Sequence, residues 1–137
     1  ESARNLFAIK PRVAVLSYST NGSANGESAE TSRTAAKILK AENHNFVVDG
    51  EMQLDSALVP EVCGLKYPNS QIQGDANVLV FPDLQSGNIA YKAIERFGSL
   101  KAVGPIIQGL KKPINDLSRG ASVEDIIFTS AITIIMA

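Results

Sequence analysis

The run Arg-Val-Ala-Val-Leu-Ser at residues 12–17 is apolar and β-branched and follows a proline, which is typical of a strand buried inside a domain. Similar runs occur at residues 46–48 and 77–81. A fourth run, at residues 102–107, is interrupted by a Gly-Pro pair. The sequence therefore predicts four strands.

Segments with helical patterns lie between and after these runs. They cover residues 27–43, 54–65 and 86–97, and Pro60 is expected to disturb the second. A last helix is predicted from residue 123 to about 136, opened by Ser122. The alternation of strands and helices predicts a parallel sheet covered by helices on both faces.

The composition sets limits on the class of protein. With 137 residues, 45% hydrophobic and 20% charged, the chain is expected to form one globular domain. The net charge of -1 argues against a nucleic-acid binder, which neutralises phosphates with an excess of basic residues. The single cysteine excludes an intrachain disulfide and a cysteine metal cluster, and it fits a reducing cytoplasm.

A ligand rim can be predicted from the strand order. Ligands of parallel α/β sheets bind at the carboxyl ends of the strands. This rule places four segments on one rim: residues 17–26, 49–55, 82–88 and 108–122.

The first rim segment holds a polar loop formed by Ser19, Thr20, Asn21, Gly22 and Ser23. A loop between a strand and a helix can bind phosphate or a nucleotide through its backbone N–H groups. The loop lacks the Gly-Lys-Ser/Thr ending of a Walker loop. Its composition is equally that of an ordinary polar loop, so both interpretations stay open.

Further rim residues are candidates of different kinds. Asn88 and Gln108 are candidate substrate-binding residues. The carboxylates of Asp49, Glu51 and Asp55 could suggest a metal site, but no histidine accompanies them, and we favour a structural role and expect no metal.

The most informative stretch reads Asn-Asp-Leu-Ser-Arg-Gly at residues 115–120 and Ser-Val-Glu-Asp at residues 122–125. It combines a hydroxyl, a guanidinium and carboxylates in a loop that leads into a helix, whose first turn favours anions. Arg119 is suited to bind phosphate. The alternative is a capping box of Ser122 and Asp125, with Ser118 and Arg119 as ordinary loop residues.

These two strings resemble the C-terminal signature of phosphate acetyltransferases. Residues 11–23, 49–60, 76–89 and 104–110 are similar to further segments of that family. Five blocks in the family's order therefore cover nearly the whole chain.

The resemblance implies a three-layer α/β/α fold with a mainly parallel sheet, like that of isocitrate and isopropylmalate dehydrogenases. Residues 1–137 would be the C-terminal phosphate acetyl/butyryltransferase domain of a two-domain enzyme whose N-terminal half is absent. The implied activity is reversible transfer of an acetyl group between acetyl phosphate and coenzyme A. The resemblance also implies a cytoplasmic homodimer without a tightly bound cofactor.

The resemblance assigns roles to individual residues. Ser118 would contact the coenzyme A thiol, Arg119 the phosphate, and Asp125 would be the base for the thiol, while Asn115 joins the candidate substrate-binding residues. A thiol has a pKa of ~8.5 and an aspartate a pKa of ~3.9, so moving a proton from the thiol to the aspartate costs roughly 6 kcal/mol. We therefore expect Asp125 to be buried, which raises a carboxyl pKa, and Arg119 to face the phosphate away from Asp125.

Two alternatives remain at this point. Certain malic enzymes carry a related, non-catalytic domain that senses acyl-coenzyme A, although there the Asp-Leu-Ser-Arg-Gly string is usually degraded. Phosphate butyryltransferase performs the same reaction on a longer acyl chain. One methylene changes binding by only ~1–3 kcal/mol, so the sequence does not fix the acyl length.

Overall fold

The computed structural model describes residues 2–137, so residue 1 lies outside the described part of the chain. None of the helices described combines the length and the apolar character that crossing a membrane requires. In chain order the elements are α1 (Ser2–Phe7), β1 (Arg12–Leu16), α2 (Glu27–Ala41), β2 (Val47–Met52), α3 (Leu54–Leu58), α4 (Pro60–Lys66), β3 (Val78–Val80), α5 (Leu84–Gly98) and α6 (Val123–Ile135).

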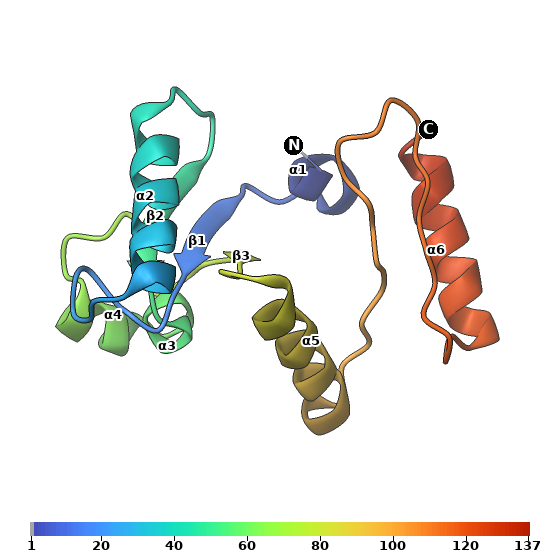
Figure 1. Cartoon of the computed structure of the whole chain (residues 1–137). Coiled ribbons are helices and arrows are strands. Elements are labelled where there is room, and N and C mark those ends of the chain that lie inside the picture. The colour runs from blue at the N-terminus through green and yellow to red at the C-terminus, as the bar shows by residue number, and fades with distance from the viewer. Residues whose placement is uncertain (1) are drawn as a thin grey trace.

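The strands form one parallel sheet in the order β2-β1-β3 (Figure 1). In the register, Val13 of β1 lies opposite Val48 of β2 and Val78 of β3. The crossover from β1 to β2 runs through α2, and the crossover from β2 to β3 runs through α3 and α4. The three strands predicted first are confirmed, as is the disturbance at Pro60, which separates α3 from α4.

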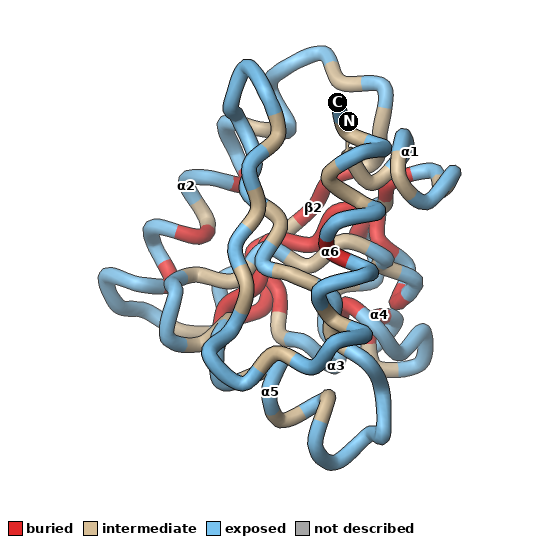
Figure 2. Tube along the Cα trace, turned by 90° about the vertical axis from the view of Figure 1, so that its right-hand side faces the viewer, coloured by how far each residue is buried: buried red, intermediate tan, exposed pale blue. Residues whose placement is uncertain are grey.

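Helices cover both faces of this sheet because the side chains of β1 alternate between them. One face packs against α3 and the loop after α4, and the other packs against α2. The first core cluster contains Ala14, Leu16, Met52, Ala57 and Ile72, and the second contains Val13, Val15, Ala36 and Val48. The predicted three-layer α/β/α arrangement is confirmed, and the buried residues gather around the strands in Figure 2.

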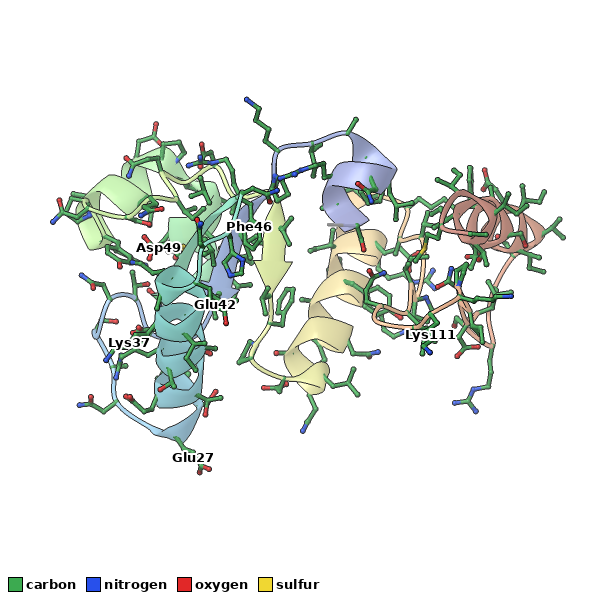
Figure 3. All side chains as sticks on the ribbon, turned by 90° about the horizontal axis from the view of Figure 1, so that it is seen from above. Glu27, Lys37, Glu42, Phe46, Asp49 and Lys111 are labelled. Carbon is green, nitrogen blue, oxygen red and sulfur yellow. The ribbon has the colours of Figure 1, made fainter. Side chains whose placement is uncertain are left out.

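Asp49 of β2 is a fully buried carboxylate next to the sheet (Figure 3). It accepts hydrogen bonds from Lys40 Nζ at 2.7 Å, Ser70 Oγ at 2.9 Å and the Gln71 backbone N–H at 2.8 Å. Burial alone would raise the pKa of Asp49, but the hydrogen bond from Lys40 and those from backbone N–H groups hold it below its ordinary value. Asp49 therefore ties α2 and the loop after α4 to the sheet.

The prediction of a fourth strand at residues 102–107 is wrong. This segment runs without ladder pairing in the structure. Pro105 has no N–H to donate, and Gly104 has a φ of 149°, a backbone conformation that favours glycine. Extended backbone becomes a strand only where a neighbouring strand satisfies its hydrogen bonds, and none lies beside this segment among the described residues.

The C-terminal elements stand apart from the sheet. Helix α5 has no buried residue, and α6 has one, Thr129. In Figure 1, α5 lies between the sheet and the long segment that leads to α6. Residues of α5 and of that segment line a cleft.

Candidate functional site

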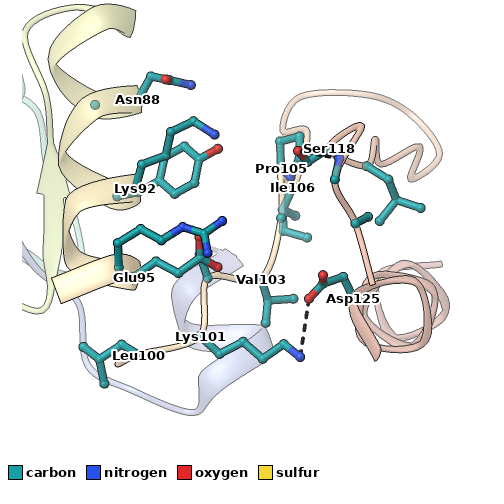
Figure 4. Close-up of a pocket in the computed structure, with 18 of the residues that line it drawn as sticks. Asn88, Lys92, Glu95, Leu100, Lys101, Val103, Pro105, Ile106, Ser118 and Asp125 are labelled. Carbon is teal, nitrogen blue, oxygen red and sulfur yellow. Dashed lines mark hydrogen bonds and ion pairs between the residues drawn. The ribbon is translucent and has the colours of Figure 1, made fainter. Parts of the chain in front are cut away.

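The cleft has a volume of about 1290 Å³. One wall is α5, which begins directly after the carboxyl end of β3. The opposite wall is formed by residues 100–106 and by the turn that opens α6. Asn88, Lys92 and Glu95 face Ser118 and Asp125 across the cleft in Figure 4.

Asp125 lines the cleft from the first turn of α6. Its Oδ2 accepts the Ser122 backbone N–H and the Ser122 Oγ–H, both at 2.7 Å, and its own backbone N–H donates to Ser122 Oγ at 3.2 Å. The predicted capping box is therefore present. The free N–H groups of a helix start and their dipole favour a negative charge at this position.

The expectation that Asp125 is buried with a raised pKa is wrong. Its side chain is 31% exposed, and Lys101 Nζ lies 3.4 Å from Oδ1. The hydrogen bonds from Ser122 and then the charge of Lys101 hold the pKa of Asp125 below its ordinary value. The carboxylate is thus ionised at neutral pH.

Ser118 and Arg119 are exposed in the turn before α6. Ser118 lines the cleft, and its backbone carbonyl accepts the N–H of Ala121 at 2.9 Å. Among the described residues, no ion pair joins Arg119 to Asp125, and Arg119 does not line the cleft. That Arg119 faces a bound phosphate stays a prediction.

Asn115 has a structural task in this chain. Its Oδ1 accepts the backbone N–H of Ile107 at 2.9 Å, and its Nδ2 donates to Thr133 Oγ1 at 2.8 Å. The side chain thereby joins two segments of irregular backbone to α6. It does not line the cleft, so substrate binding by Asn115 stays a prediction.

The polar loop at residues 19–23 is organised by a buried carboxylate, Glu51. Glu51 Oε1 accepts hydrogen bonds from Ser19 Oγ and the Gly22 backbone N–H, both at 2.8 Å, and from Arg33 at 3.1 Å. Burial alone would raise the pKa of Glu51, but Arg33 and these donors hold it below its ordinary value. Like Asp49 with Lys40, Glu51 therefore has the structural role predicted for it.

The structure does not bring all the predicted rim residues together. Asn21 and Gly22 line a separate hollow of about 370 Å³ beside α2, and none of the loop residues Ser19, Thr20 and Ser23 lines the main cleft. Gln108 also lies outside the cleft and accepts a hydrogen bond from Ser2 Oγ. The predicted single rim is therefore wrong: the loop after β1 lies at its own hollow, and the cleft is formed beyond the carboxyl end of β3. Two of the segments predicted for the rim contribute residues to the cleft, namely Asp83, Leu84, Gly87 and Asn88 from one, and Leu117, Ser118, Gly120, Ala121 and Ser122 from the other.

Three cations line the cleft that the motifs did not predict: Lys92, Arg96 and Lys101. The sequence did hold a signal for two of them. Asn88, Lys92 and Arg96 follow one another at intervals of four residues and therefore share one face of α5. The position of Lys101 depends on how the chain returns after α5, which no local pattern predicts.

Together, a parallel α/β sheet and a cleft lined by Ser118, three cations and three carboxylates, one of them Asp125, define an α/β protein with a charged cleft beside its sheet. The chain matches the model of the phosphate acetyl/butaryl transferase family over residues 1–134. It is 54% identical over 137 residues to the phosphate acetyltransferase of Clostridium acetobutylicum, a match that covers 100% of this chain and 41% of that protein. The chain belongs to this family.

Solved structures agree with this assignment. A phosphotransacetylase from Streptococcus pyogenes superposes with a TM-score of 0.90 at 48% identity, covering 98% of this chain and 40% of that one. A branched-chain phosphotransacylase from Enterococcus faecalis gives a TM-score of 0.76 at 30% identity, covering 98% and 49%. The chain thus spans less than half of each of these relatives.

Proposed function

We propose that this chain forms the C-terminal part of a phosphate acetyltransferase, which moves an acetyl group reversibly between acetyl phosphate and coenzyme A. The observation that carries the proposal is the cleft in which Ser118 and Asp125 face a wall with two cations, Lys92 and Arg96. Family membership and the name of the Clostridium acetobutylicum relative support the acetyl group as the cargo.

In the proposed reaction, the thiol sulfur of coenzyme A attacks the carbonyl carbon of acetyl phosphate. A C–S bond forms, the bond between the carbonyl carbon and the oxygen that bridges to phosphorus breaks, and phosphate leaves. The thiol proton passes to Asp125 and then to solvent, which regenerates the carboxylate. Arg119 binds the phosphate and offsets the charge that develops on it.

Proton transfer in this site is expected to be concerted with C–S bond formation. Because the pKa of Asp125 lies below its ordinary value, forming a free thiolate before the attack would be costly. Simultaneous transfer avoids that intermediate. Ser118 supports the step by donating a hydrogen bond to the sulfur as negative charge builds on it.

The proposal also covers the oligomeric state and the cellular compartment of the enzyme. The enzyme works as a homodimer in the cytoplasm and needs no tightly bound cofactor or metal. The lone cysteine fits a reducing compartment. Sedimentation of the complete enzyme at several concentrations tests the dimer, because a dimer has twice the mass expected for one chain.

The two alternatives are less well supported. The Asp-Leu-Ser-Arg-Gly string is intact at residues 116–120, whereas a sensing domain has no need of it. The Enterococcus faecalis structure is named a branched-chain phosphotransacylase, but its identity to this chain is 30% against 54% for the acetyltransferase from Clostridium acetobutylicum. An acetyl group is therefore the favoured cargo.

The test is thioester formation from acetyl phosphate and coenzyme A. Because the chain spans 41% of the Clostridium acetobutylicum enzyme, it should be assayed alone and as a hybrid, in which it replaces its matching segment in that enzyme. We expect phosphate-releasing thioester formation by the hybrid, and a loss of about 100-fold or more with Ser118→Ala.

The matched control is Ser28→Ala, since Ser28 is an exposed serine on α2 outside the cleft. This variant should retain the rate of the unmodified hybrid. A hybrid that binds coenzyme A but forms no thioester would contradict the proposal and favour the sensing domain. Equal rates for Ser118→Ala and Ser28→Ala would exclude Ser118 from the reaction.

A further inference from the structure

Lys101 joins the segment that follows α5 to the start of α6 by charge, within the cleft wall that lies opposite α5. It lies three residues beyond the end of α5, in the segment that leads away from that helix. Its Nζ forms an ion pair with Glu124 and lies 3.4 Å from Asp125 Oδ1. Among the described residues, no other side-chain hydrogen bond or ion pair joins residues 84–103 to residues 117–137.

The ammonium group of Lys101 has a third contact with α6. It lies 5.1 Å from the centroid of the Phe128 ring, within the range of a cation–π contact. Glu124 and Phe128 are four residues apart on α6 and therefore share one face of the helix, and Asp125 lies beside that face. Three contacts with one helix turn define the position of the ammonium group better than a single surface ion pair does.

We propose that Lys101 is a positioning residue for Asp125, whose carboxylate it holds in place at the edge of the cleft. The inference rests on the proposed function in one respect, namely that Asp125 is the group that takes the thiol proton. The contact itself is independent of that role.

Charged groups of both signs surround Asp125. Glu124 is adjacent on the same helix, and Glu95 lines the cleft on α5, and both disfavour a second negative charge. Lys92 and Arg96 of α5 line the same cleft and act in the opposite direction. Lys101 is the cation that contacts the carboxylate directly, and it contributes to holding the pKa of Asp125 below its ordinary value, after the hydrogen bonds from Ser122.

The contact also has a geometric consequence. Asp125 Oδ2 accepts the two hydrogen bonds that Ser122 donates, from its backbone N–H and its Oγ–H, and Lys101 approaches Oδ1. The two carboxylate oxygens are therefore engaged separately. Lys101 restricts rotation of the carboxyl group, whereas Ser122 alone would leave Oδ1 free to turn.

The direct test is the carboxyl titration of Asp125, followed by ¹³C NMR in the 137-residue chain. We expect Lys101→Met to move the titration of Asp125 to higher pH, because a favourable positive charge is lost. Lys101→Arg keeps the charge and should return the titration to near the original pH. Lys111→Met is the matched control, since Lys111 is an exposed lysine outside the cleft, and it should leave the titration unchanged.

A titration of Lys101→Met that coincides with that of Lys111→Met would overturn the inference. Failure of Lys101→Arg to restore the original titration would overturn it too, because the charge would then not be the cause. Neither result depends on enzymatic activity.

The same variants in the hybrid separate this inference from the proposed function. If Asp125 is the base, the acidic limb of the rate of acetyl transfer moves to higher pH in Lys101→Met, in step with the NMR titration. A shifted titration with an unshifted acidic limb would leave the Lys101 contact established and would reject Asp125 as the base.

Discussion

The sheet region, residues 11–83, and the cleft region, residues 84–137, differ in what stabilises them. Apart from Thr129, every buried residue of the described chain lies between residues 11 and 74. The cleft region holds Ser118, Arg119 and Asp125 but has no core cluster of its own among the described residues. Stability and the proposed chemistry are therefore carried by different parts of the chain.

Helix α6 shows the difference most clearly. Its residues are apolar on nearly all sides, and Ile127, Ile134 and Ile135 are 60%, 75% and 68% exposed. A helix that is apolar all round is normally buried. The sheet region, by contrast, buries its apolar residues within the chain itself. A substitution should therefore change folding in the sheet region and leave folding nearly unchanged in the cleft region.

The largest effect on stability is expected for Asp49→Asn. The change leaves Lys40 without its anionic partner and places an amide N–H₂ against the donors that the carboxylate accepted. The Lys40 side chain is 37% exposed, so the cost arises mainly from the donors left unpaired around the buried side chain at position 49, and we expect more than about 3 kcal/mol by urea unfolding of the chain.

Its control is Asp75→Asn, which breaks the surface pair with Arg12, where the Asp75 side chain is 51% exposed. That change should cost less than about 1 kcal/mol. Similar costs for the two variants would remove the distinction between a buried and a surface carboxylate.

A smaller but equally diagnostic pair is Met52→Ala and Ile134→Ala. Met52 is fully buried in the first core cluster, so truncation leaves a cavity and should cost about 3 kcal/mol. Ile134 is 75% exposed, and its truncation should stay within about 0.5 kcal/mol. Unfolding midpoints in urea measure both. A cost for Ile134→Ala close to that of Met52→Ala would show that α6 is packed in solution, contrary to the comparison.

Acid should destabilise the sheet region. The pKa values of Asp49 and Glu51 are lower in the folded chain than in the unfolded chain. The two carboxylates therefore stabilise the fold fully above their unfolded pKa values, at about 4, and this stabilisation is lost as the pH falls toward their folded pKa values. We expect the free energy of unfolding to be flat from neutral pH to about 5 and to fall below about 4. In the Asp49→Asn variant the free energy of unfolding should fall less steeply with decreasing pH. An unchanged slope would contradict the conclusion that the Asp49 carboxylate stabilises the folded sheet region.

Local patterns predicted much of the fold. The apolar runs placed β1 and β3, and the Ser-Val-Glu-Asp string placed the capping box of α6. These features depend on neighbours in sequence or on one buried face. The lack of ladder pairing at residues 102–107 was not predictable in this way, because an extended run becomes a strand only beside a partner.

The site was predicted less completely than the fold. The motif predicted Ser118 and Asp125 as neighbours of a ligand, and the structure brings both to the cleft, while their contact with a ligand stays a prediction. The prediction that Asp125 is buried was wrong, because its carboxylate caps α6 and this cap lies at an exposed turn. Lys101 was missed, because its contact with Asp125 spans a segment without regular structure.

The most direct test of the proposed chemistry compares Asp125→Asn with Asp116→Asn in the hybrid. The Asp125→Asn side chain would keep an oxygen for the capping box but no longer accept the thiol proton, whereas Asp116 accepts the N–H of Leu117 and does not line the cleft. The measured quantity is the rate of thioester formation from acetyl phosphate and coenzyme A. We predict a loss of about 10²–10⁴-fold for Asp125→Asn and a change of no more than a few-fold for Asp116→Asn. Retention of the full rate by Asp125→Asn would contradict the account.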